Sequence, residues 1–160
     1  MSLSNKIIAG TLVGAGVLAV ATYFRNIQRA QAQLEVIPTA NIHQLSLEGL
    51  TIRVDAQLKN PTGASFKIKY PYIQLSHSGH LVGSSQAINK DIKIPAYGQV
   101  MIHDIMVKIP VTGFFTLVFD LVKALMNKQA ITFTIAVITT VDLGWTQLAY
   151  EHKQDISLKK

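Results

Sequence analysis

The sequence predicts a mainly β protein, a β-sandwich with one inserted amphipathic helix, preceded by a single transmembrane helix. Three observations predict this fold class. Residues 7–24 form an uncharged and mostly apolar run. From Leu34 onward, apolar and polar residues largely alternate with the period of two that is typical of β-strands. Residues 114–126 instead repeat their apolar side chains at helical spacing.

The run from Ile7 to Phe24 is long enough to cross a bilayer. Its eighteen residues span about 27 Å as a helix, close to the thickness of the hydrocarbon core. Apolar side chains at every helical angle leave no polar face, so lipid is expected to surround them. We therefore predict a membrane anchor and short stalk at residues 1–32 and one β domain at residues 33–160. The residues expected to contact lipid are Ile7, Ile8, Leu12, Val13, Val17, Leu18, Val20 and Phe24.

A cleaved secretory signal is the alternative interpretation of this run. Ala19-Val20-Ala21 and Ala30-Gln31-Ala32 both match the small-residue pattern of a cleavage site. The run is longer than the usual apolar part of a signal, which favours a retained anchor. Its orientation stays open, because Lys6 with the amino terminus nearly balances Arg25 and Arg29.

Small residues inside the run recur at a spacing of four. Such spacing lets two helices approach closely, although glycine and alanine are also simply tolerated in apolar helices. The candidate helix-packing residues are Gly10, Gly14, Ala15 and Ala19. Lys6, Arg25 and Arg29 flank the run and are expected to contact anionic headgroups.

Composition excludes several classes of function. The net charge is +6, but the lysines of the domain are scattered, so a nucleic-acid partner is not expected. The chain has no cysteine, which excludes disulfides, thiolate zinc sites and cysteine nucleophiles. Charged residues make up only 15% of the chain, a low share that is compatible with a face that contacts other proteins.

The strands follow from the alternation and from turn signals. Leu50 to Lys59 alternates strictly, and Asn60-Pro61-Thr62-Gly63 ends it as a turn. Pro71 interrupts the next strand, which marks an edge or a bulge, and Ser78-Gly79 forms a hairpin tip. The apolar, β-branched segment at residues 131–141 reads as a central strand. The other strands are expected at residues 66–70, 72–75, 81–83, 88–94, 100–109, 145–150 and 154–158.

The one predicted helix of the domain covers about fifteen residues and ends near Met126, with Thr112 able to cap its start. Its apolar stripe is expected to close one end of the sandwich. The alternative is a partner-binding face, for which the candidate residues are Phe114, Phe115, Leu117 and Leu121.

Catalytic and metal motifs are weak. His77 and His80 supply only two metal ligands, and His103-Asp104 reads as a half-buried histidine more readily than as a general base. Neither a Gly-x-Ser-x-Gly nucleophile elbow nor a phosphate-binding glycine loop is present in the sequence. We interpret Trp145 as a core residue. The alternative is a surface patch that it forms with Tyr150 and His152. We assign no catalytic, cofactor-binding or metal-ligating residue and expect neither an enzyme nor a cofactor.

The order of these motifs resembles a known family. The strand that ends in Leu58-Lys59-Asn60-Pro61-Thr62 is followed by a glycine hairpin (Gly79, Gly83), the bend Ile94-Pro95-Ala96 and a helix before the last strands. This order is similar to that of type 2 late embryogenesis abundant proteins, also called the water-stress and hypersensitive-response domain. Thr62 stands where that family often has asparagine. The resemblance covers roughly residues 34–158 and implies an immunoglobulin- or fibronectin-like sandwich without enzymatic activity.

Two functions are therefore expected from the sequence. The first is a non-enzymatic structural protein, anchored in a bilayer, whose sandwich packs against other protein subunits in a virion membrane or a cell envelope. The low charge content favours this reading. The second is a tethered binding module that protects against desiccation stress, as the resemblance implies. Both place the chain at a membrane through a single N-terminal pass.

Overall fold

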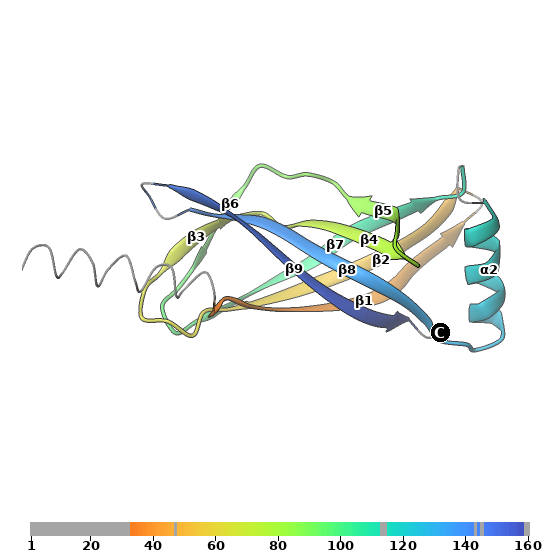
Figure 1. The fold of residues 1–160 in the computed structure, drawn as a ribbon, viewed down its shortest axis with the longest axis horizontal. Helices are drawn as coiled ribbons and strands as arrows, with labels where there is room; N and C mark the ends of the chain where they lie inside the picture. Colours follow the sequence, from red (N-terminus) through yellow and green to blue (C-terminus); the bar gives the residue numbers. More distant parts are fainter. Residues whose placement is uncertain (1–32, 47, 113–114, 143, 145, 159–160) are drawn as a thin grey trace, which may run out of the picture.

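The computed structural model describes residues 33–46, 48–112, 115–142, 144 and 146–158. The predicted anchor and stalk, residues 1–32, lie outside this range. Within it, no helix combines the length and the apolar content needed to cross a membrane. The elements, shown in Figure 1, are β1 (Glu35–Ser46), β2 (Gly49–Lys59), β3 (Phe66–Lys69), β4 (Tyr72–His77), β5 (His80–Ser85), β6 (Asp91–Ile94), β7 (Gln99–Pro110), α2 (Phe115–Met126), β8 (Ile131–Asp142) and β9 (Gln147–Leu158).

The described strands form one continuous antiparallel sheet, which refines the β-sandwich predicted from the sequence. The nine strands run in the order β1-β2-β7-β5-β4-β8-β3-β6, and β9 pairs with β8. The reason is β5, which pairs with β4 on one side and with the end of β7 on the other, through Ser84 and Ser85. The mainly β class with one short helix is confirmed.

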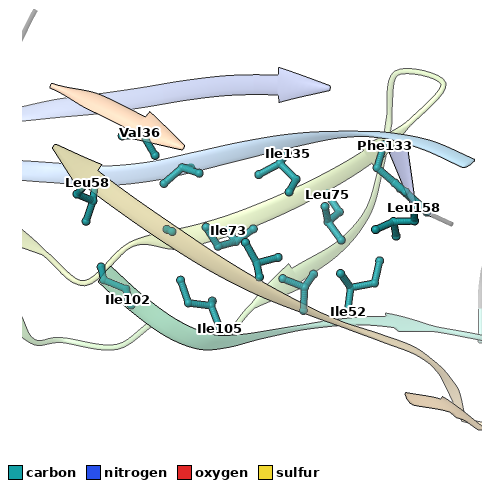
Figure 2. Packing of buried hydrophobic residues seen from close by; sticks show 14 of the residues in the cluster. Val36, Ile52, Leu58, Ile73, Leu75, Ile102, Ile105, Phe133, Ile135 and Leu158 are labelled. Carbon is teal, nitrogen blue, oxygen red and sulfur yellow. The ribbon is translucent and has the colours of Figure 1, made fainter. Parts of the chain in front are cut away.

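The sheet folds over so that one face of each layer lines a common core. In β2 the even-numbered residues from Leu50 to Leu58 are all buried, while the odd-numbered residues are half-buried. This is the strict alternation in the sequence, expressed as one apolar and one polar face. Figure 2 shows Ile52 and Leu58 of β2 together with Ile73 and Leu75 of β4 in the same cluster.

A β-bulge in β7 reverses the alternation halfway along that strand. Val54 pairs with Ile105, but Ala56 pairs with Ile102, so His103 and Asp104 together face Asp55. Asp104 has a φ of 59° and donates its amide N–H to Asp55 Oδ1 at 2.9 Å. The bulge shifts the phase of the strand by one residue. The inward-facing residues are therefore even-numbered before it (Val100 half-buried, Ile102 buried) and odd-numbered after it (Ile105, Val107 and Ile109, all buried).

The sequence did not predict β1 as a separate strand and divided β9 into two strands. Pro38 interrupts the pattern of β1, but β1 pairs only with β2, and an edge strand tolerates a missing N–H. Residues 147–158 form one strand because β8 pairs with it along its whole length. Trp145, which was predicted to be a core residue, lies outside the described residues.

A hydrogen bond ties β9 to the residue that precedes β1. Tyr150 Oη donates to the Leu34 carbonyl oxygen at 2.9 Å, and burial raises the pKa of the Tyr150 hydroxyl. We expect Tyr150→Phe to lower the free energy of unfolding by about 1 kcal/mol, measured by chemical denaturation. Because the pKa is raised in the folded state, this contribution is complete below the unfolded pKa of Tyr150 and decreases as the pH rises through the folded pKa. Equal stability of the two proteins at pH 7 would contradict this assignment.

Helix α2 lies across one end of the folded sheet, as Figure 1 shows, and this confirms the expected closing helix. Val118 and Leu121 are buried in the core, whereas Phe119 and Met126 are exposed. The helix begins three residues after Thr112 and has twelve residues, so it is shorter than predicted.

The end of α2 is a Schellman motif with lysine in place of the usual glycine. The Gln129 N–H donates to the Ala124 carbonyl oxygen at 2.9 Å, and Lys128 has a φ of 56°. We expect Lys128→Gly to raise the free energy of unfolding by about 1 kcal/mol, because glycine adopts this conformation without steric cost. Lys123→Gly, inside the helix, should lower it by about the same amount. Denaturation curves of the two variants check both signs.

Candidate functional site

Most site residues predicted from the sequence lie outside the described residues. These are the eight lipid-contacting residues, the four helix-packing residues Gly10, Gly14, Ala15 and Ala19, and the headgroup contacts Lys6, Arg25 and Arg29. Among the candidate residues of the partner-binding face, Phe114 is not one of the described residues, and the side chains of Phe115 and Leu117 are not described either. Leu121 is only 3% exposed and belongs to the core, so it is not offered to a partner.

The structure places His77 against neighbouring groups of the fold and leaves His103 exposed. His77 Nδ1 lies 2.9 Å from the Thr132 carbonyl oxygen and therefore carries the proton that it donates, and the ring packs against Phe133. His103 is exposed, not half-buried as predicted, because the bulge at Asp104 turns it outward. Its Nδ1 lies 3.9 Å from Asp55 Oδ1. Among the described residues, no three histidines or carboxylates are grouped to hold a metal ion.

Asn60 is the most highly connected polar side chain that the structure describes. It is 2% exposed, and its Nδ2 donates to the Ala64 carbonyl oxygen at 2.8 Å and to the Pro95 carbonyl oxygen at 2.9 Å. Its Oδ1 accepts hydrogen bonds from the backbone N–H of Thr62 at 3.0 Å and from Thr62 Oγ1 at 2.7 Å. We call this arrangement the Asn60 lock. It joins the β2–β3 turn to the β6–β7 turn, which are far apart in the sequence.

Two backbone hydrogen bonds complete the lock. The Asn60 N–H donates to the Gly98 carbonyl oxygen at 2.8 Å, and the Tyr97 N–H donates to the Thr62 carbonyl oxygen at 2.8 Å. Tyr97 has a φ of 51°, which is uncommon for an aromatic residue, and its side chain is 78% exposed. The lock thus fixes the point at which β6 turns into β7. Sequence analysis identified this turn, but not that the Asn60 side chain holds two loops together.

Beyond this turn, β6 and β7 separate and leave a cleft of about 440 Å³ between them. The two strands do not pair with each other, since β6 pairs only with β3, and β7 meets β5 only at Val107 and Lys108. In Figure 1 the green segment between β5 and β6 arches away from the strands at this place. We call this space the β6–β7 cleft. It is lined by Tyr70, Lys90, Asp91, Ile92, Val100, Met101, Ile102 and His103.

The cleft combines an apolar floor with a charged rim. Tyr70, Ile92 and Val100 pack against the core. Burial, and then the negative charge of Asp104, raise the pKa of Tyr70. At the rim, Lys69 Nζ lies 2.6 Å from Asp91 Oδ1, and this hydrogen bond lowers the pKa of Asp91. The cleft therefore presents apolar side chains, a tyrosine hydroxyl and charged groups side by side.

Comparison with known proteins identifies solved structures that have a similar fold. No protein-family model matches the chain, and no curated protein matches it. The solution structure of AT1g01470 from Arabidopsis thaliana is 14% identical, covers 80% of this chain and 82% of its own, and has a TM-score of 0.58. The crystal structure of a protein from Archaeoglobus fulgidus is 12% identical, covers 80% and 98%, and has a TM-score of 0.54.

A third solved structure, described as a late embryogenesis abundant protein, is 16% identical and covers 99% of this chain and 91% of its own, with a TM-score of 0.44. At these identities, what the two structures with the higher TM-scores share with this chain is the fold.

Proposed function

We propose that this chain is a non-enzymatic binding module of the water-stress type, tethered to a membrane by residues 7–24 and protective under desiccation. The Asn60 lock is the observation that carries the proposal. The Asn60-Pro61 pair and the Pro95 bend are two of the motifs on which the family resemblance rests. In this structure they bond to each other, because Asn60 Nδ2 donates to the Pro95 carbonyl oxygen.

The shared fold supports the same proposal in a coarser way. AT1g01470 has a similar fold over four fifths of this chain, and fold alone does not determine function. We also propose that the strands of the folded sheet are arranged as in an immunoglobulin or fibronectin domain, as the resemblance implies. The other function considered was a structural subunit packed within a larger particle. No observation in the described part of the chain favours it.

The test is protection of a labile enzyme during drying. Neutral-lipid vesicles carrying the full chain are dried with lactate dehydrogenase and rehydrated, and the remaining activity is measured. We expect more activity than with empty vesicles. Asn60→Ala keeps residues 1–32 but removes the lock, so it should lose most of the protection, while Asn41→Ala, at an exposed asparagine, should keep it. Equal activity with the full chain and with empty vesicles would overturn the proposal.

A further inference from the structure

We propose that the β6–β7 cleft binds an extended, acidic peptide, which adds to the free edge of β7 as a further strand. This inference deepens the proposed function, on which it rests for its biological sense, because it names the class of partner that a protective module would hold. Three features of the cleft support it: the direction of the backbone groups, the apolar lining and the charges at the rim.

The backbone groups of β7 point into the cleft at alternate residues. The Asn60 N–H bonds to the Gly98 carbonyl oxygen, and Leu58 pairs with Val100 two residues further along. Hydrogen-bonded and non-hydrogen-bonded pairs alternate in an antiparallel ladder. Val100 and Ile102 therefore direct their N–H and C=O groups toward β2. Those of Met101 and its neighbours at positions 99 and 103 point away from β2, toward the cleft.

The backbone groups of β6, which forms the opposite wall of the cleft, alternate in direction in the same way. The Tyr70 N–H donates to the Lys90 carbonyl oxygen at 2.7 Å, so Ile92 and Ile68 form a hydrogen-bonded pair. The backbone groups of Asp91 and Lys93 consequently point away from β3. However, β6 has four residues and carries charged side chains, which is how proteins protect an edge from pairing. The edge of β7 is therefore the one that we assign to the added strand.

The free edge of β7 has a defined length. It begins at Gln99, next to the Asn60 lock, and it is interrupted at Asp104 by the bulge. The five residues between these points span about 17 Å, enough to pair with a short extended segment. Beyond the bulge, β5 occupies the same side of β7 at Val107 and Lys108. The bulge and β5 limit the peptide to this stretch.

The cleft offers an apolar lining to a partner. Ile92, Val100, Met101 and Ile102 line it, and Met101 is 46% exposed. Exposed apolar side chains in a groove indicate a binding surface, in contrast to scattered ones. An added strand would place every second side chain against Met101 and its surroundings. Strand addition typically derives affinity from main-chain bonds and specificity from such alternate contacts.

The charges at the rim favour an acidic partner. Asp91 is already bound by Lys69 Nζ at 2.6 Å, and Asp55 accepts the amide N–H of Asp104 at 2.9 Å. Lys90 lines the cleft and forms no ion pair within the described residues. Lys93, on the same strand, lines a neighbouring pocket with Lys67 and Asp142. Asp91 and Asp55 are thus engaged, while Lys90 remains available to pair with an acidic side chain.

The test uses the full chain in neutral-lipid nanodiscs and a fluorescent hexapeptide of alternating glutamate and valine. We expect saturable binding by fluorescence anisotropy and slower hydrogen exchange at the Gln99, Met101 and His103 amides. The Val100 and Ile102 amides, which face β2, should not change. A peptide N-methylated at the residues that face β7 should bind at least about tenfold more weakly. Protection only at the β1 or β9 edge, or self-association of the chain instead of peptide binding, would overturn the proposal.

Two sets of variants separate charge from backbone. Lys90→Glu should weaken binding of the glutamate peptide and strengthen binding of its lysine analogue, whereas the matched change Lys108→Glu should keep the original preference. Met101→Pro removes an N–H that faces the cleft and should abolish binding without unfolding the domain. Unchanged binding by the Lys90→Glu variant would contradict the assigned site. Because no drying step is involved, peptide binding and desiccation protection can fail independently.

Discussion

Replacing Asn60 with alanine is expected to lower the free energy of unfolding by about 3 kcal/mol or more, since each buried polar group left without a partner costs roughly 1–3 kcal/mol. The change removes both donors from the Ala64 and Pro95 carbonyl oxygens and the acceptor from the Thr62 N–H. These groups lie in a part of the fold that water does not readily reach, since Asn60 is 2% exposed. Urea denaturation of the full chain in a mild detergent, followed by circular dichroism, measures the loss.

Asn60→Asp distinguishes the lock from a generic turn. Aspartate keeps the acceptor oxygen Oδ1 but places a second oxygen where Nδ2 donates to the Ala64 and Pro95 carbonyl oxygens. A buried charge would then face two carbonyl dipoles, so the loss at pH 7 should equal or exceed that of the alanine variant. Asn41→Ala is the control and should change stability by less than about 0.5 kcal/mol. A loss below about 1 kcal/mol for Asn60→Ala would mean that the two turns hold together without the side chain.

Phe133→Ala is expected to have the second large effect, a loss of about 3–5 kcal/mol in the free energy of unfolding. Phe133 is among the largest fully buried side chains of the described residues, at 1% exposure, and lies on β8 between two paired strands. Truncation leaves a cavity that strands bonded on both sides cannot close, and it also removes the contact with the His77 ring. Thermal and urea denaturation of the full chain both report this change.

A matched phenylalanine provides the control. Phe119 on α2 is 61% exposed, so Phe119→Ala should cost less than about 1 kcal/mol, because little buried area is lost and alanine has the higher helix propensity. Phe133→Leu should fall between wild type and Phe133→Ala, because it removes less buried volume. If the two alanine variants lost equal stability, Phe133 would not be part of the core that holds the folded sheet together.

Local patterns predicted the elements whose environment is set within the segment itself. The alternation from Leu50 to Lys59 gave the correct buried face of β2, and the helical stripe gave α2 and its buried Val118 and Leu121. The bulge at Asp104 could not be predicted, because it depends on which residue of β2 faces it. For the same reason the exposure of His103 was predicted wrongly.

The candidate site was only partly visible in the sequence. Asn60-Pro61 was recognised as a turn and as a family motif, yet its partner Pro95 is thirty-five residues away along the chain. The side-chain hydrogen bonds of the Asn60 lock form only when both turns are in place. No local sequence pattern predicts the β6–β7 cleft, because the cleft arises where two strands that are consecutive in the sequence do not pair with each other.

What the sequence by itself determined is the mainly β class, the phase of its strictly alternating strands, the single helix of the domain and the positions of the main turns. These follow from side-chain periodicity and from residues that favour or interrupt each element. Only the tertiary structure decided that one sheet folds over through β5, and that the edge of β7 at residues 99–103 stays open. Strand pairing is a long-range interaction: which edge remains free depends on where distant segments pack.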